Sequence, residues 1–170
     1  ESLNGAERRV RDGQAWMGIC TVIPTMSQDL SAHELTRVSI VPVVAAHHPL
    51  AQLPSPVQRE QLAAHTQFIL TNVAGPSLPD RCIVGHNTWR FADGHSRLEF
   101  LLGGLGWGNV PRFLIEDELA SGRLRSLQVE DVGVTPEPIP VYAIHLREQP
   151  LGPAARWLLA CLLRQSWPQV

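Results

Sequence analysis

The segment LLGGLGWGNVPRFLIEDELASGRL, residues 101–124, constrains the fold of this chain more than any other. Asp93 is the expected N-cap of a helix that leads into it. Four leucines share one face of that helix because of their spacing: Leu98, Leu101, Leu102 and Leu105. The glycines at 103, 104 and 106 are expected to end the helix, and residues 107–110 leave room only for a strand.

A second helix is expected after this strand. Pro111 suits its first turn, where a missing N–H costs nothing, and Gly122 suits a left-handed C-cap after about Ser121. The residues at 116–118 are acidic and should face solvent, whereas Ile115 and Leu119 should be buried. This order of helix, strand and helix indicates half of a ligand-binding α/β lobe.

Strands and helices also alternate elsewhere in the chain. Strands are expected over 16–21, 38–44, 67–71, 82–84, 88–91 and 141–146. Helices are expected over about 3–12, over 57–64 and after Pro150, where apolar residues recur at helical spacing. The strand, helix, strand order over 38–71 predicts parallel pairing, and the apolar stretch at 38–44 predicts a central strand.

Composition excludes several classes of protein. The chain has 170 residues, is 44% hydrophobic and 18% charged, and so has enough apolar surface for a folded core. It lacks an apolar run of roughly 18 residues, the length that a membrane span needs. A formal net charge of -2 and a pI near 6.4 offer no broad basic surface for DNA.

Motifs for cofactors, metals and catalysis are weak. GGLGWG superficially resembles a dinucleotide fingerprint, but its glycines end a helix, whereas the fingerprint follows a strand and opens a helix. The seven histidines, including His47, His48, His86 and His95, lack metal-ligand spacing, and surface or turn positions are expected for them. The sequence also lacks a G-x-S-x-G nucleophile elbow. We therefore expect no cofactor, no metal site and no catalysis.

The three cysteines are at Cys20, Cys82 and Cys161, an odd number that suits a reducing cytoplasm. Two roles are open to them, thiol sensing and inert packing. Packing is favoured because Cys20 falls in a strand pattern and Cys161 in an apolar helix.

The combination of motifs resembles the C-terminal effector-binding domain of the bacterial LysR-type transcriptional regulators. In that family a helix, a GLGW or GLGI turn, a proline and a helix similar to EDELASGRL follow in this order. Three further segments are similar to family elements: LNGAERRVRDGQAWMGI at 3–19, VVAAHHPLA at 43–51 and PLGPAARWLLACLL at 150–163. Within the HPLA turn, His48 is expected to orient the crossover loop.

The resemblance implies an α/β, two-lobed type II periplasmic-binding-protein-like fold with two crossover strands. Regulatory lobe one is expected over 1–44 together with 142–170, incomplete at its N-terminus, and lobe two over 45–141. The crossover strands are expected near Val43 and Ala143. A winged helix-turn-helix that binds DNA is expected in the intact protein and absent from this chain.

The resemblance and the ends of the expected strands together predict a site for a small, anionic effector between the lobes. Short polar side chains at helix N-termini can bind a carboxylate through N–H groups and the helix dipole. Trp107 could line the cleft as an aromatic wall or belong to the core. The expected effector-binding residues are Ser2, Thr21, Thr71, Asn72, Gly106 and Trp107.

Two other functions compete with this regulator. A periplasmic solute-binding protein has the same two-lobe architecture, and a signal peptide in the full gene would favour it. A small enzyme on an α/β scaffold would need a cluster of catalytic groups that the sequence does not supply. For the regulator we expect a cytoplasmic homodimer or homotetramer that binds an effector, does not associate with membranes, and contacts DNA only through the helix-turn-helix.

Overall fold

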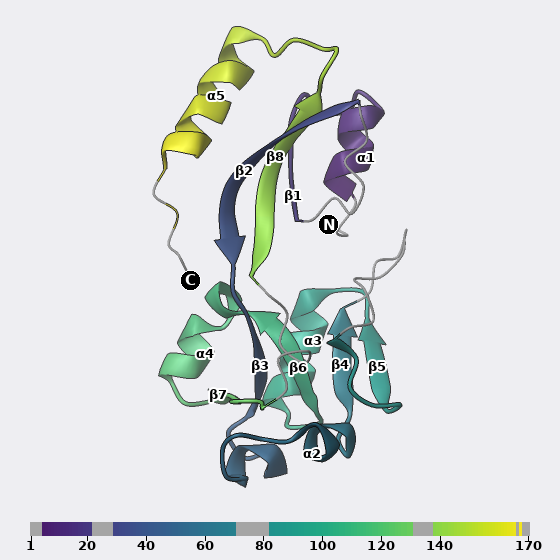
Figure 1. Cartoon of the computed structure of the whole chain (residues 1–170), viewed down its shortest axis with the longest axis vertical. Coiled ribbons are helices and arrows are strands. Elements are labelled where there is room, and N and C mark those ends of the chain that lie inside the picture. Colours follow the sequence, from purple (N-terminus) through teal and green to yellow (C-terminus); the bar gives the residue numbers. More distant parts are fainter. Residues whose placement is uncertain (1–4, 22–28, 71–81, 131–137, 166, 168–170) are drawn as a thin grey trace. The chain divides into compact units, whose positions relative to one another are not determined.

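We describe the chain from a computed structural model that covers residues 5–21, 29–70, 82–130, 138–165 and 167 (Figure 1). Contacts divide it into two units. Unit 1 comprises Glu1–Val38 and Pro138–Val170, and unit 2 is the continuous segment Ser39–Glu137. In the part of the chain that the structure describes, no helix has the length and apolarity needed to cross a membrane.

Unit 1 is built on an antiparallel sheet of three strands. Its order is β1 (Gly18–Thr21), β8 (Ile139–Leu146) and β2 (Leu30–Val38), so β8 is central. Helices α1 (Gly5–Arg11) and α5 (Pro153–Arg164) complete the unit. The core beneath α1 is formed by Val10, Cys20, Leu30 and Ile144. Gly13, with φ of 69°, ends the turn after α1, as the Asp-Gly pair predicts.

Unit 2 contains a mixed sheet of five strands, in the order β5, β4, β6, β3, β7. These strands are β3 (Ile40–Ala45), β4 (Gln67–Leu70), β5 (Thr88–Phe91), β6 (Trp107–Pro111) and β7 (Leu124–Ser126). Its helices are α2 (Arg59–Ala63), α3 (Gly94–Leu102) and α4 (Glu116–Ala120), with short 3-10 helices at Pro49–Gln52 and Arg112–Leu114.

Two hydrophobic clusters bury the side chains of this sheet. One includes Val44, Leu62 and Trp107, and the other includes Val43, Phe68, Leu101 and Val110. Successive strand residues point to opposite faces, so the neighbours Val43 and Val44 contribute to different clusters. Burial on both sides explains why this strand lacks polar residues.

The parallel pairing expected between the two strands of the segment 38–71 is not formed. β4 is parallel to β5 and to β6, but β3 is antiparallel to both β6 and β7. β6 separates β3 from β4, so the predicted pairing between these two strands is wrong. The predicted strand at 38–44 is also two strands, because β2 ends at Val38 and β3 begins at Ile40.

The GLGW segment follows its predicted order with two differences. Leu105 is 53% exposed, because the helix already ends at Leu102 and Gly104 turns the chain with φ of 70°. Pro111 is the last residue of β6 rather than the start of a long helix. A 3-10 helix follows it, and α4 is only five residues long.

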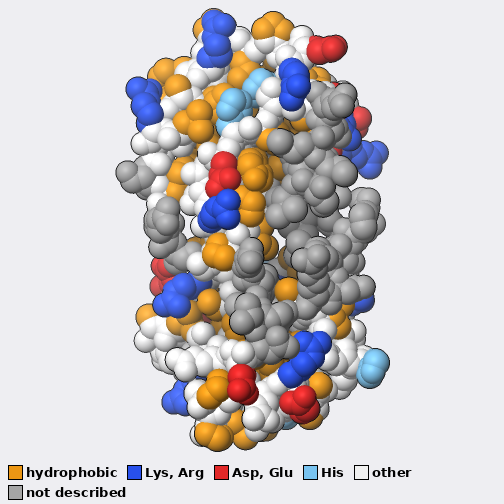
Figure 2. Space-filling model, viewed as in Figure 1, with side chains coloured by type: hydrophobic (Ala, Val, Ile, Leu, Met, Phe, Trp, Pro, Cys, Tyr) orange, Lys and Arg blue, Asp and Glu red, His pale blue; other side chains and the backbone are white. Residues whose placement is uncertain are grey.

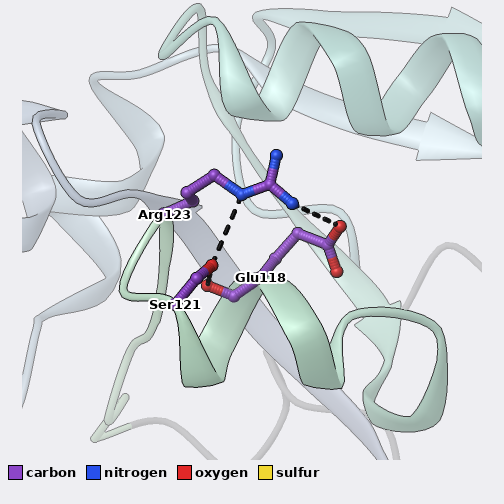
Figure 3. A network of polar contacts seen from close by, with 3 residues as sticks. All are labelled: Glu118, Ser121 and Arg123. Atoms are coloured by element: carbon purple, nitrogen blue, oxygen red, sulfur yellow. Dashed lines mark hydrogen bonds and ion pairs between the residues drawn. The ribbon is translucent and has the colours of Figure 1, made fainter.

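A polar network holds the turn after α4 (Figure 3). The Arg123 guanidinium donates to Glu118 Oε1 at 3.1 Å and to Ser121 Oγ at 3.4 Å, and Ser121 Oγ donates to the Glu118 carbonyl at 3.2 Å. Gly122 has φ of 72°, as its predicted role as a C-cap requires. The network gives Glu118 and Arg123 of the EDELASGRL motif a structural role.

The boundaries between the units differ from the predicted ones. They lie between residues 38 and 39 and between 137 and 138, whereas 44/45 and 141/142 were expected. Val43 therefore belongs to unit 2, where β3 pairs with β6 and β7. Ala143 lies within β8, where it pairs with both β1 and β2 of unit 1.

Candidate functional site

The carboxyl edge of the unit 2 sheet is the candidate site. Parallel strands β4 and β5 end there at Leu70 and Phe91, which are paired. Ile40, the first residue of β3, pairs with Pro111 at the end of β6, so the chain enters unit 2 at this same edge. Small ligands of open α/β sheets usually bind outside the carboxyl ends of parallel strands.

The predicted effector-binding residues are only partly described. Ser2, Thr71 and Asn72 lie outside the described residues. The described strand β4 ends at Leu70, the residue before Thr71 in the sequence. Thr21 is half-buried at the end of β1 in unit 1, where it pairs with Val141.

Gly106 and Trp107 lie at the other end of the unit 2 sheet. Trp107 pairs with Gln67, the first residue of β4, and β4 must extend three more residues to reach Leu70. At about 3.3 Å per residue, this separates the two edges by roughly 10 Å. The structure therefore does not bring Gly106 and Trp107 to the edge from which Thr71 and Asn72 follow.

The side chain of Trp107 belongs to the core. It is 0% exposed, packs with Leu62 and Val44, and donates its indole N–H to the Leu62 carbonyl at 3.1 Å. Packing, rather than an aromatic cleft wall, is the interpretation that fits this position. Trp107 also fixes α2 against the sheet, because Leu62 lies in that helix.

Gly106 permits a close approach of two backbone segments. A Cβ atom there would overlap the Thr66 carbonyl oxygen and would lie 2.9 Å from two ring carbons of Phe68. The same carbonyl accepts from the Trp107 N–H at 3.0 Å, which limits how far it can move. This glycine therefore serves the packing of β6 against β4.

Arg97 is a charged residue at this sheet that the sequence analysis missed. It is only 6% exposed on α3, and its Nη1 donates to the Asn109 carbonyl at 3.2 Å. Burial lowers the pKa of Arg97 to about 10. The available signal was helical spacing, since Arg97 lies four residues before the buried Leu101 and thus on the same face.

His48 has a structural role in the HPLA turn. Its Nδ1 accepts from the Leu50 N–H at 3.1 Å, which caps the 3-10 helix that begins at Pro49. Its ring contacts that of His65 edge-on, with centroids 4.9 Å apart. Burial, together with His65 and His47, lowers the pKa of His48 to about 4. His48 is therefore neutral at physiological pH and helps to fix the loop after β3.

A second histidine pair joins strands that are distant in sequence. His33 on β2 and His145 on β8 have their Nε2 atoms 3.3 Å apart, and His145 Nδ1 is 2.9 Å from the Leu146 carbonyl. Burial, followed by the neighbouring His145, lowers the pKa of His33. Among the described residues, no group of three or more His, Cys, Asp or Glu side chains is arranged to hold a metal ion.

The cysteines are free thiols. Burial, with a smaller contribution from Glu7, raises the pKa of Cys20 to about 11. Burial also raises the pKa of Cys82. Both environments favour the thiol over the reactive thiolate and therefore favour packing over sensing.

A hollow of about 710 Å³ lies on unit 2, beside the amino ends of β4 and β5. Its polar lining includes His86, Asn87 and the exposed Arg90. Asn87 donates to Thr66 Oγ1 at 3.0 Å, and its carbonyl accepts from the Gln67 N–H. The side chain and backbone of Asn87 thus help to hold the loop before β5.

Comparison with known proteins identifies a family that spans nearly the whole chain. A family model described as the LysR substrate binding domain matches residues 1–167. The HTH-type transcriptional regulator AceR of Acinetobacter baumannii is 31% identical over 128 residues, which cover 74% of this chain and 42% of that protein. The uncharacterized HTH-type transcriptional regulator YeeY of Escherichia coli is 30% identical over 103 residues, 59% and 33% of the two chains. The chain thus spans less than half the length of these curated relatives.

Solved structures share the fold at low sequence identity. The regulatory domain of CcmR from Synechocystis, in complex with 2-PG, has a TM-score of 0.77 and 17% identity, and the match covers 95% of this chain and 78% of that one. The effector-binding domain of QuiR, in complex with shikimate, has a TM-score of 0.77 and 16% identity, with 96% and 78% coverage. The predicted family and the two-lobed type II periplasmic-binding-protein-like fold are confirmed: this chain belongs to the LysR substrate-binding domain family.

Proposed function

We propose that this chain is the effector-sensing domain of a LysR-type transcriptional regulator. It binds a small anionic metabolite between its two lobes and thereby modulates DNA binding by a helix-turn-helix elsewhere in the protein. Domains of this family regulate transcription and are not enzymes. The solute-binding alternative is not favoured, because the curated relatives are HTH-type regulators.

The observation that carries this proposal is the coincidence of two features at one edge of unit 2. Parallel strands β4 and β5 end there, and β3 brings the chain in from unit 1 at the same edge. A ligand at this edge can contact the segment through which the lobes are connected. The small molecules 2-PG and shikimate, in complex with CcmR and QuiR respectively, support an effector of similar size.

We assign direct contact with the effector to Ser2, Thr21, Thr71 and Asn72. Hydroxyl and amide groups suit hydrogen bonds to a carboxylate or phosphate. Gly106 and Trp107 receive a supporting role instead, since the Trp107 side chain is buried and Trp107 pairs with Gln67 at the amino end of β4, opposite the candidate edge. They hold β6 and α2 in place, and with them the sheet in which β4 ends at Leu70.

A ligand screen by thermal shift tests this site. An effector at 100 times its Kd adds about 2.7 kcal/mol of stability, which raises the melting temperature of a chain of this size by roughly 5 to 10 °C. Thr71→Ala should weaken the affinity for the identified effector. Thr88→Ala is the matched control, because Thr88 pairs with Gln67 at the opposite edge. An effector that binds the wild type and Thr71→Ala with equal affinity would exclude this site.

We further propose that DNA is bound outside this chain. The formal net charge is -2, and Figure 2 shows acidic and basic side chains interspersed on the face that it draws. Binding to DNA normally requires several clustered cations and weakens steeply with salt. The isolated chain should not retard duplex DNA in a gel at low salt, whereas the intact regulator should retard its operator. Salt-sensitive retardation by the isolated chain would contradict this assignment.

In the intact protein we propose a cytoplasmic homodimer or homotetramer. A two-fold contact is the commonest route to a dimer, and regulators that bind symmetric operators use such symmetry. Light scattering of the intact protein should give two or four times the mass of one subunit. A monomer at micromolar concentration would contradict the proposal.

A further inference from the structure

We propose that Arg97 supplies the positive charge that binds the carboxylate or phosphate group of the effector. The inference rests on the proposed function, and it adds to it a residue and a chemical class of ligand. It follows from the burial of Arg97, from its hydrogen bonds and from its place on the sheet.

Arg97 is a buried guanidinium with few partners. It is 6% exposed and makes one hydrogen bond to the described residues, from Nη1 to the Asn109 carbonyl at 3.2 Å. Its Nε is buried and has no hydrogen-bond partner within the described segments. A guanidinium carries five N–H donors, so most of its capacity is unused. Buried polar groups in native proteins are nearly always paired, which makes this Nε an exception that calls for an explanation.

Arg97 also forms no ion pair with a carboxylate of the described residues. The ion pairs of the described residues are formed by other arginines, such as Arg123 with Glu118. Burial lowers the pKa of Arg97 only to about 10, so the guanidinium is protonated at neutral pH. A buried cation without an anion is unfavourable, and an anionic ligand would relieve that penalty.

The position of Arg97 matches the candidate site. α3 begins three residues after Phe91, the carboxyl end of β5, and Arg97 lies in its first turns. The ladder between β4 and β6 ends at the pair Phe68 and Gly108, and the next carbonyl along β6 is that of Asn109. Arg97 therefore bonds to β6 on the side toward which β4 ends at Leu70, immediately before Thr71.

The chemistry of the side chain sets the class of ligand. A guanidinium is planar and presents its N–H groups as a fork that fits carboxylate and phosphate oxygens in pairs. The free Nε is one arm of such a fork. Arg90 on β5 offers the same group, but it is exposed to water, where a single ion pair contributes little. Of these two arginines, Arg97 is therefore the one whose environment favours a bound anion.

Titration with inorganic phosphate and with acetate, at constant ionic strength, tests the proposal. The Nε–H signal of Arg97 in a ¹⁵N NMR spectrum of the wild type should shift saturably with at least one of these anions. The melting temperature should rise over the same concentration range. Arg97→Gln should weaken the anion affinity by about tenfold or more, because a charge-assisted hydrogen bond is lost, and Arg90→Gln should leave it unchanged.

Two results would overturn the proposal. One is an Arg97 Nε–H signal that neither anion shifts saturably, a measurement that needs no variant and holds even if Arg97→Gln fails to fold. The other is equal stabilisation of the wild type and Arg97→Gln. Failure of the proposed site gives a different result, because the identified effector would then bind the wild type and Thr71→Ala with equal affinity.

Discussion

The buried His48 should make the stability of this domain depend on pH. The folded protein holds His48 in its neutral form, because Nδ1 accepts the Leu50 N–H and the side chain is almost fully buried, with 4% exposed. The pKa of His48 is about 4 in the folded protein, compared with 6.5 for an unperturbed histidine, the value we take for the unfolded chain. The unfolded chain therefore binds a proton more readily, and acidification favours unfolding.

The magnitude follows from the difference between the two pKa values. Each pKa unit corresponds to 1.36 kcal/mol, so the full effect is about 3 kcal/mol, of which about 2 kcal/mol is lost between pH 7.5 and pH 5. The contribution of neutral His48 to the free energy of unfolding is fully present above pH 6.5, decreases as the pH falls, and is lost below about pH 4. Protonation would also remove the acceptor for the Leu50 N–H.

Urea unfolding of the wild type and His48→Asn, at several pH values from 7.5 to 4.5, measures this effect. Asparagine can cap the same N–H but does not titrate in this range, and the other six histidines are common to both proteins. The difference in unfolding free energy should therefore change by about 2 kcal/mol between pH 7.5 and 5. Equal pH dependence in the two proteins, or an NMR pKa near 6.5 for His48, would refute the reasoning.

Three further predictions concern packing. Trp107→Phe should lower the free energy of unfolding by about 1 to 3 kcal/mol, because the indole hydrogen bond to the Leu62 carbonyl is lost and the smaller ring fills the core less well; unchanged stability in urea would show that the indole ring contributes little. Gly106→Ala should lower the free energy of unfolding by about 1 to 3 kcal/mol, because the new Cβ overlaps the Thr66 carbonyl oxygen. Gly94→Ala, whose Cβ meets nothing within 4 Å, should be neutral or slightly stabilising. Equal melting temperatures of the two variants would contradict the overlap. Cys20 should resist iodoacetamide at pH 8 until the protein unfolds, given its raised pKa; rapid labelling of the native protein would disprove its protection.

Features set by neighbours in sequence could be predicted. Asp93 caps α3 by accepting the Ser96 N–H at 2.8 Å, and Gly122 adopts a positive φ, as expected. β5 spans Thr88–Phe91, the predicted range. Caps and turns depend on side chains within a few residues, so a single sequence contains the necessary information.

Features set by distant neighbours could not be predicted. β6 lies between β3 and β4, and β3 runs antiparallel to β6. Nothing in the sequence of β3 indicates which strand is its partner. Trp107 was ambiguous between cleft and core because its burial depends on Leu62, which is 45 residues away. The candidate site was predicted only in part for the same reason, since Arg97 gains its significance from a carbonyl on β6.

The order of the two units along the chain has a consequence for biosynthesis. Unit 2 is continuous in sequence, but the central strand of unit 1, β8, is made only after all of unit 2. The ribosome adds roughly 5 to 20 residues per second, so the hundred or so residues between β2 and β8 take about 5 to 20 s. Throughout that time β1 and β2 lack the strand with which both pair. Nascent chains are therefore most exposed to wrong strand pairing and to chaperones while unit 2 is emerging and folding.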